Sequence, residues 1–283
     1  MYCVLHPLLA QTHTKFSLNL FHFLLLIISS VLIAAAGYII NDYFDLNIDR
    51  INKPKKLIVQ KIISRRYAIA WHFFLSMAGI AIGFYLDFTT HATLLGFSNL
   101  ICAVLLFIYS VSLKKRLLSG NILISLLTAW TVLVVTWCEA RFLLTPGINT
   151  SRILRATLLY AGFAFIISLV REAIKDMEDI DGDARFGCKT LPIVWGINAA
   201  KIYTAVWMTI LCIMLLVLQV YVLQFHWWLS SVYCLLFIFI PLVDVFRKLF
   251  KAQTPHDFHA LSSRVKFIMF TGILSMIFFL FYS

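Results

Sequence analysis

Long apolar stretches, each close to the length of a membrane-spanning helix, recur along the 283 residues of this chain. A helix needs about 20 consecutive apolar residues to cross the hydrocarbon core of a bilayer, which is roughly 30 Å thick. With 61% hydrophobic and only 13% charged residues, the chain has more apolar surface than a soluble enzyme can bury. The pattern predicts an all-α polytopic transmembrane helical bundle of about eight spans. The expected spans are 17–43, 67–88, 92–113, 122–144, 153–175, 199–223, 227–249 and 265–282.

The basic residues fall mainly in the connections between these stretches. Four alternating connections carry most of them, at 50–66, 114–116, 175–189 and 247–251, and the intervening connections are short or poor in Lys and Arg. This distribution follows the positive-inside rule, which places basic connections on the cytoplasmic side of the membrane. The net charge of +11 therefore indicates topology rather than a nucleic-acid partner.

Acidic residues are scarce, yet most of them gather in two short segments. Of the 13 Asp and Glu residues, three lie within 42–49 and six within 172–183. Removing a carboxylate from water near a bilayer costs several kcal/mol unless it is paired or binds a metal, so these residues are candidates for function. Each segment holds three aspartates with the same spacing, at the end of an apolar stretch. The two triads are Asp42, Asp45, Asp49 and Asp176, Asp179, Asp183.

The spacing within each triad predicts a wall of carboxylates. On a helix that advances 100° per residue, positions i, i+3 and i+7 fall within an arc of roughly 60°, so each triad can share one face. Helix capping, or pairing with Arg50 or Arg171, would explain a single aspartate but neither the triplet nor its recurrence. An EF-hand calcium loop fits poorly, because Gly182 comes too early after Asp179 and a later acidic ligand is missing.

Crowded carboxylates without histidine or cysteine favour Mg²⁺, which keeps water ligands and bridges to substrate phosphates. Two such walls facing each other describe a diphosphate site. The predicted metal ligands are Asn41, Asp42, Asp45, Asp49, Asp176, Asp179 and Asp183. Neighbouring Lys and Arg side chains could bind the phosphate oxygens whose charge the metal does not neutralise. Each of these side chains, taken alone, could also be a loop charge that sets the topology of the protein in the membrane. The candidate substrate-binding residues are Asn41, Arg50, Lys53, Lys114 and Lys175.

A diphosphate site in a membrane domain points to an isoprenoid diphosphate, whose apolar tail would lie among the hydrophobic side chains of the bundle. Neutralising the departing diphosphate lets the allylic carbon–oxygen bond break toward a carbocation, which a nucleophilic acceptor then captures. Tyr109 lies just before Lys114, where it could act in the reaction or serve as an interfacial anchor. The predicted catalytic residues are Asp42, Asp45, Asp179, Asp183 and Tyr109.

The chain contains no linker rich in Pro, Gly or Ser, which predicts a single membrane domain over 1–283. The second triad ends its span as the first triad does, after four further spans. This recurrence predicts two pseudo-repeat halves, about 1–119 and 120–283, that face each other across a central cavity and bring the triads together.

Three ordered motifs resemble those of the UbiA-type intramembrane prenyltransferases, and together they cover most of the chain. The first motif runs Asn41-Asp42-x-x-Asp45-x-x-x-Asp49 and continues to Ile51-Asn52-Lys53-Pro54. The second motif begins Lys175-Asp176-Met177-Glu178-Asp179 and continues through Gly187 to Lys189-Thr190-Leu191-Pro192. Between them, Tyr109 to Lys114 followed by Gly120-Asn121 resembles the loop that the family carries there.

The resemblance implies an all-helical bundle of typically nine spans, Mg²⁺-dependent transfer of a polyprenyl group, and metal or diphosphate roles for the Asn and Asp residues named above. The run Leu113-Lys114-Lys115 before Gly120-Asn121 is most similar to members that attach a geranylgeranyl group to geranylgeranylglyceryl phosphate. Other members prenylate an aromatic quinone precursor such as 4-hydroxybenzoate or dihydroxynaphthoate, which stays an alternative. The implied partners are a polyprenyl diphosphate, a lipophilic acceptor and the lipid of a bacterial or archaeal-type cell membrane, with the active site on the cytoplasmic side.

The chain departs from the family pattern in two places. The segment after the first motif, 55–61, lacks the usual Pro and Gly, which leaves the shape of this loop open. The first helix of the family would precede residue 17, where the chain shows no span. We therefore expect one wall of the cavity to be absent or incomplete.

An ion-coupled membrane transporter is the alternative from another class, because intramembrane acids and internal repeats also mark transporters. Transport sites usually lie near the bilayer midplane, at broken helices. Both triads instead lie at the ends of spans beside basic connections, which favours a prenyltransferase.

Overall fold

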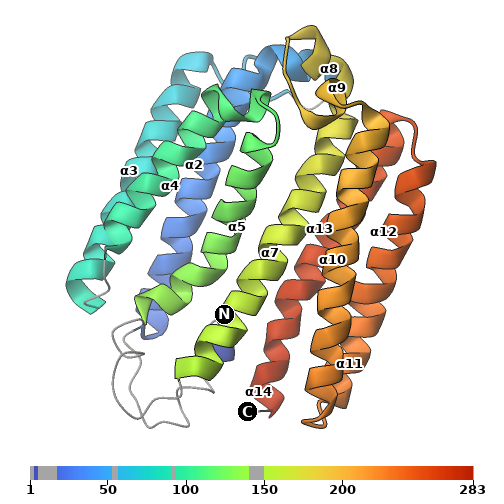
Figure 1. Cartoon of the computed structure of the whole chain (residues 1–283). Helices are drawn as coiled ribbons and strands as arrows, with labels where there is room; N and C mark the ends of the chain where they lie inside the picture. Colours follow the sequence, from blue (N-terminus) through green and yellow to red (C-terminus); the bar gives the residue numbers. More distant parts are fainter. Residues whose placement is uncertain (1–2, 6–17, 53–56, 91–93, 140–149, 283) are drawn as a thin grey trace.

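The computed structural model describes residues 3–5, 18–52, 57–90, 94–139 and 150–282. The elements are α2 (Leu20–Asn52), α3 (Arg65–Thr90), α4 (Leu95–Val111), η1 (Leu113–Lys115), α5 (Ser119–Cys138), α7 (Thr150–Glu178), α8 (Ile180–Arg185), α9 (Leu191–Val194), α10 (Ile197–Leu223), α11 (Trp228–Cys234), η2 (Leu235–Phe239), α12 (Ile240–Lys251), α13 (Pro255–Leu274), η3 (Ser275–Phe278) and α14 (Phe279–Tyr282). Long helices run side by side, and the short α8 and α9 lie together at one end of the bundle (Figure 1).

Seven helical segments in these ranges are long and apolar enough to cross a membrane, and the shorter apolar helix α4 matches the remaining predicted span. The all-α polytopic bundle is therefore confirmed, and the protein is an integral membrane protein. The expected absence of a first span concerns residues before 18, of which the structure describes only 3–5.

Two helices extend far beyond the ends that the apolar pattern predicts. Helix α2 continues to Asn52, beyond the expected end at residue 43, and therefore carries the whole first triad. Helix α13 begins at Pro255 rather than near residue 265, because a capping box precedes it. In that box the Thr254 hydroxyl accepts from the Asp257 N–H, and the Asp257 carboxylate accepts from the Thr254 N–H. A local polar cap thus extends α13 past its apolar core.

Helices α2, α3 and α4 pack against one another through apolar side chains together with small and polar ones. A Cβ on Gly79 would lie 2.7 Å from Ile33 Cγ1, so glycine allows α3 to approach α2 closely. The Ser29 hydroxyl donates to the Gly79 carbonyl at 2.7 Å, and the Asn99 amide donates to the Ser29 hydroxyl at 2.8 Å. Between helices in lipid, close packing and such hydrogen bonds provide much of the association energy.

Helix α7 is the centre of a second group of helices, with α5, α10 and α13 packed against it. Buried apolar residues of α7, α10, α12 and α13 form one continuous core cluster. Helix α5 packs chiefly on α7 and touches α4 only lightly. The division of a single domain into two duplicated halves stays a prediction.

The span from Trp228 to Lys251 is interrupted in its middle. Pro241 has no N–H to donate to the carbonyl four residues before it, which belongs to Phe237. A π-helical turn, η2, forms at this point, and Thr271 Oγ1 on α13 donates to the Phe237 carbonyl at 3.0 Å. A neighbouring side chain thus replaces the hydrogen bond that proline removes, as a polar group in lipid requires.

The four acidic residues outside the two clusters have structural roles. Asp87 accepts from the first two backbone N–H groups of α4, each at 2.8 Å. Asp257 belongs to the capping box of α13, and Asp244 pairs with two basic side chains of α12 and α13. Glu139 accepts from the Leu18 N–H at 2.9 Å. Structural contacts therefore account for these acids, and the two triads require another explanation.

Candidate active site

A cavity of about 270 Å³ lies at the end of the bundle where α2 meets α8. All six aspartates of the two triads line it, so the structure brings together segments that are far apart in the sequence. Helix α2 contributes one triad, and the segment from α7 into α8 contributes the other. Of the other predicted site residues, Asn41, Tyr109, Lys114 and Lys175 also line the cavity.

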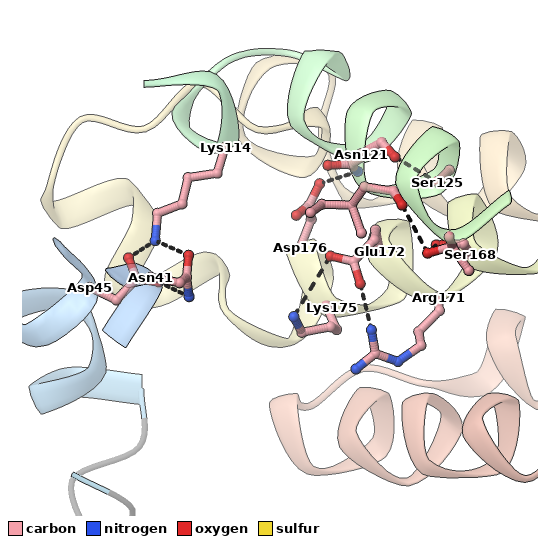
Figure 2. A network of polar contacts seen from close by, with 12 residues as sticks. Asn41, Asp45, Lys114, Asn121, Ser125, Ser168, Arg171, Glu172, Lys175 and Asp176 are labelled. Carbon is pink, nitrogen blue, oxygen red and sulfur yellow. Dashed lines mark hydrogen bonds and ion pairs between the residues drawn. The ribbon is translucent and has the colours of Figure 1, made fainter. Parts of the chain in front are cut away.

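The first triad forms the carboxylate wall that its spacing predicts, because one uninterrupted helix carries it. Asn41 Nδ2 donates to Asp45 Oδ2 at 2.7 Å, one helical turn along. Lys114 reaches this wall from η1, donating to Asn41 Oδ1 at 3.2 Å and forming an ion pair with Asp45 (Figure 2). The side chains of Lys114 and Asp45 are only 12% and 13% exposed, so the ion pair is largely withdrawn from solvent.

The position of Lys114 is constrained by the close approach of α5 to the turn that carries this lysine. Gly120, at the start of α5, lies so close to the turn that a Cβ on it would be 2.7 Å from Lys114 Cα. Burial lowers the pKa of Lys114 to about 8, and the Asp183 carboxylate opposes this shift. The ammonium group therefore contacts one wall and lies within electrostatic reach of the other, a position suited to binding a phosphate oxygen.

The second triad does not share one continuous helical face, and that prediction is wrong. Helix α7 ends at Glu178 and α8 begins at Ile180, so Asp179 occupies the break, with backbone angles φ −95° and ψ 8°. Asp176 and Asp183 lie on either side of the break, and all three aspartates still line the cavity. The spacing could not reveal the break, because a side chain from the distant helix α2 holds the backbone here.

The predicted phosphate-binding cations fall into three groups. Lys114 and Lys175 line the cavity, and Lys175 Nζ also lies 3.7 Å from Glu172 Oε2. Arg50 is exposed and is not among the cavity-lining residues, so the structure does not place it on a bound phosphate. Lys53 lies outside the described residues.

The loop after α2 borders the cavity with residues 57–59. Gln60 follows with a φ of 69°, a left-handed conformation that glycine adopts at lower cost. Its side-chain oxygen accepts from Arg50 Nη2 at 2.6 Å. Arg50 thus stabilises, through this hydrogen bond, a turn in which the chain lacks the glycine of the family pattern.

Sequence reasoning did not include three polar cavity residues among its candidates. Asn121 Nδ2 donates to Asp176 Oδ2 at 2.8 Å and orients that carboxylate (Figure 2). Glu172, one turn before Asp176, accepts from Arg171 Nη1 at 2.5 Å, and Cys188 lines the cavity. The Gly120-Asn121 motif marked the position of the asparagine, but no residue pattern shows which carboxylate it reaches.

The donor set fits Mg²⁺ bound together with a substrate. The cavity offers carboxylate and amide oxygens, the ligands that hard cations prefer. In the described part of the chain no group of three or more His, Cys, Asp or Glu side chains is arranged to hold a metal ion by itself. Mg²⁺ in proteins commonly uses one or two carboxylates and completes its shell with water and substrate phosphates. Two separated carboxylate walls therefore fit a metal ion that is also bound by water and substrate better than one held by protein ligands alone.

The fold and the site define an intramembrane enzyme with two aspartate-rich segments at one end of a helical bundle. The sequence model of the UbiA prenyltransferase family matches residues 1–281. The chain therefore belongs to the UbiA prenyltransferase family and is a membrane prenyltransferase. Members of this family generally depend on Mg²⁺. The family assignment supports the enzyme over the transporter alternative.

Named relatives and solved structures resemble the chain over most of its length. It is 30% identical over 242 residues to a digeranylgeranylglyceryl phosphate synthase of Methanosphaera stadtmanae, covering 85% of this chain and 81% of that protein. It is 36% identical over 192 residues to the protein of the same name from Methanothermobacter thermautotrophicus, covering 67% and 62% respectively. A solved UbiA homologue from Aeropyrum pernix K1 has the same fold, with a TM-score of 0.68 at 16% identity, covering 97% of this chain and 95% of that chain.

Proposed function

We propose that this protein transfers a geranylgeranyl group from geranylgeranyl diphosphate to geranylgeranylglyceryl phosphate in a Mg²⁺-dependent reaction. The observation that carries the proposal is the pair of carboxylate walls at one cavity of a membrane bundle, with Lys114 paired to the first wall. The names of the relatives from Methanosphaera stadtmanae and Methanothermobacter thermautotrophicus support this choice of acceptor. The alternating basic connections support a cavity that faces the cytoplasm. The relatives support a cell membrane of archaeal type.

In the proposed reaction the bond between C1 of the prenyl chain and the diphosphate oxygen breaks, and the diphosphate leaves with the electron pair. A glycerol hydroxyl of the acceptor attacks C1 and forms an ether bond, and its proton passes to the departing diphosphate. Mg²⁺, when bound, would supply positive charge that stabilises the departing diphosphate. Lys114 binds a diphosphate oxygen, exchanging part of its contact with Asp45 for the substrate.

The remaining cavity residues have matching roles in this proposal. Asn41 and the aspartates of the two triads would hold Mg²⁺ together with the substrate diphosphate. Lys175 adds a second cation for the diphosphate, and the Tyr109 ring stabilises the positive charge that develops on the allylic carbon.

The test uses purified protein in detergent with Mg²⁺, labelled geranylgeranyl diphosphate and geranylgeranylglyceryl phosphate. Diphosphate release should require both Mg²⁺ and the acceptor, and the labelled product should be digeranylgeranylglyceryl phosphate. Asp45→Ala and Asp179→Ala should each abolish transfer while the protein stays folded. Asp244→Ala is the matched control, because this acid lies on α12 outside the residues that line the cavity.

Each outcome separates one part of the proposal from another. Transfer to 4-hydroxybenzoate or dihydroxynaphthoate in place of the glycerol lipid would establish the aromatic acceptor instead. Retained activity in Asp45→Ala or Asp179→Ala would refute the paired-wall assignment. No transfer to any of these acceptors by the unsubstituted protein would refute the proposed function.

A further inference from the structure

Asn52, the last residue of α2, connects the two aspartate-rich segments directly. Its side-chain Nδ2 donates to the Asp179 carbonyl at 3.0 Å, and its Oδ1 accepts from the Gly182 N–H at 2.9 Å. The carboxamide therefore uses its donor and its acceptor on one short stretch of backbone. The residues it joins are 127 and 130 positions away in the sequence.

The backbone at Gly182 is shaped to receive this side chain. A Cβ on Gly182 would lie 2.5 Å from both Nδ2 and Oδ1 of Asn52, and 2.6 Å from its Cγ. Real Cβ atoms do not approach other heavy atoms this closely, and Gly182 is itself buried. The asparagine and the glycine thus form one close-fitting contact, which we call the Asn52 clamp.

The clamp acts where the second triad is least constrained by its own helix. Asp179 occupies the break between α7 and α8, and Asp183 lies in the six-residue helix α8. On the other side, Asn52 follows Asp49 by three residues on the same rigid helix. The two hydrogen bonds therefore hold the backbone of one carboxylate wall at a set distance from the other.

We propose that Asn52 is a positioning residue that sets the separation of the two carboxylate walls and thereby the affinity of the cavity for a divalent cation with diphosphate. This inference rests on the proposed function, because the proposed function assigns the divalent cation and the diphosphate to the cavity. Asn52 itself does not reach the reacting atoms and is not among the cavity-lining residues. Groups that orient metal ligands typically change metal affinity by about 10–100-fold when they are removed.

The first experiment measures binding rather than turnover. Mn²⁺ is titrated, with and without inorganic diphosphate, into the full-length protein in detergent, and free Mn²⁺ is measured by electron paramagnetic resonance. Asn52→Ala and the nearly isosteric Asn52→Asp, which loses the donor, should each weaken Mn²⁺–diphosphate binding about 10–100-fold. Asn47→Ala, at an exposed position of the same helix, should bind as the unsubstituted protein does.

The second experiment uses the contact with Gly182. Gly182→Ala should weaken binding to the extent that Asn52→Ala does, because its Cβ displaces the carboxamide. In the double variant Asn52→Ala/Gly182→Ala the clash is gone, so binding should be no weaker than in either single variant. Independent effects that multiply in the double variant would overturn the clamp.

The outcomes also separate the clamp from the proposed function. Unchanged Mn²⁺–diphosphate binding in both Asn52 variants would overturn the inference, even if their unfolding temperature falls, because the side chain would then only stabilise the fold. If the unsubstituted protein binds Mn²⁺–diphosphate but transfers no prenyl group, while the Asn52 variants lose binding, the clamp stands and the proposed function fails.

Discussion

Gly120→Ala tests whether the start of α5 sets the position of Lys114. The added Cβ would lie 2.7 Å from Lys114 Cα and 3.1 Å from the Leu113 carbonyl oxygen. Carbon atoms in contact prefer separations of about 3.5–4.0 Å, so the helix or the lysine turn must retreat by about 1 Å. Both neighbours are backbone atoms, which cannot rotate out of the way.

The size of the effect follows from this displacement. Overpacking of this kind costs about 1–3 kcal/mol of unfolding free energy. A shift of about 1 Å in a substrate-binding group lowers the rate by about 10²-fold. We therefore expect kcat/KM for geranylgeranyl diphosphate to fall about 10²-fold in Gly120→Ala, with a lower unfolding temperature. The assays are prenyl transfer with labelled substrate and thermal unfolding, both in the same detergent.

Gly162→Ala provides the matched control. Gly162 lies in α7, and a Cβ added to it would meet no heavy atom within 4 Å, apart from those of its own helix and chain neighbours. Alanine in a helix interior is favoured over glycine by about 0.5–1 kcal/mol, so this variant should be fully active and slightly more stable. Full activity and an unchanged unfolding temperature in Gly120→Ala would refute the proposed close contact.

Three further predictions concern single hydrogen-bonding groups. Asn121→Ala removes the donor that orients the predicted metal ligand Asp176, so kcat/KM should fall about 10–100-fold. Thr271→Val leaves the Phe237 carbonyl without its interhelical donor and should lower the unfolding free energy by about 1–3 kcal/mol, measured by chemical denaturation in detergent. Asp87→Ala removes the acceptor for the first two N–H groups of α4 and should cost about 0.5–2 kcal/mol by the same measurement.

Controls for these variants come from the same helices or the same residue types. Thr209→Val removes only a bond to the Ala205 carbonyl four residues back in α10, so it should change stability far less than Thr271→Val does. Asp87→Asn keeps one oxygen acceptor and should recover part of the loss. Equal destabilisation by both threonine substitutions, or unchanged activity in Asn121→Ala, would contradict the roles assigned to these contacts.

The sequence by itself determined the helical bundle and most of the polar and charged residues that line the cavity. Each apolar stretch must become a helix in lipid, because only a helix satisfies its own backbone hydrogen bonds there. The first triad lies on one face because the periodicity of a single helix decides it. The six aspartates were identifiable because a carboxylate near a membrane is costly without a role. Asn41 was identifiable because it lies one helical turn before Asp45.

Only the tertiary structure decided how these residues are held. The hydrogen bonds of Asn121 to Asp176 and of Gly182 to Asn52 join residues 55 and 130 positions apart. The break at Asp179 likewise escapes any argument from helical spacing. The physical reason is that such contacts depend on how closely two backbones approach, and that approach results from the packing of the whole bundle rather than from any local segment.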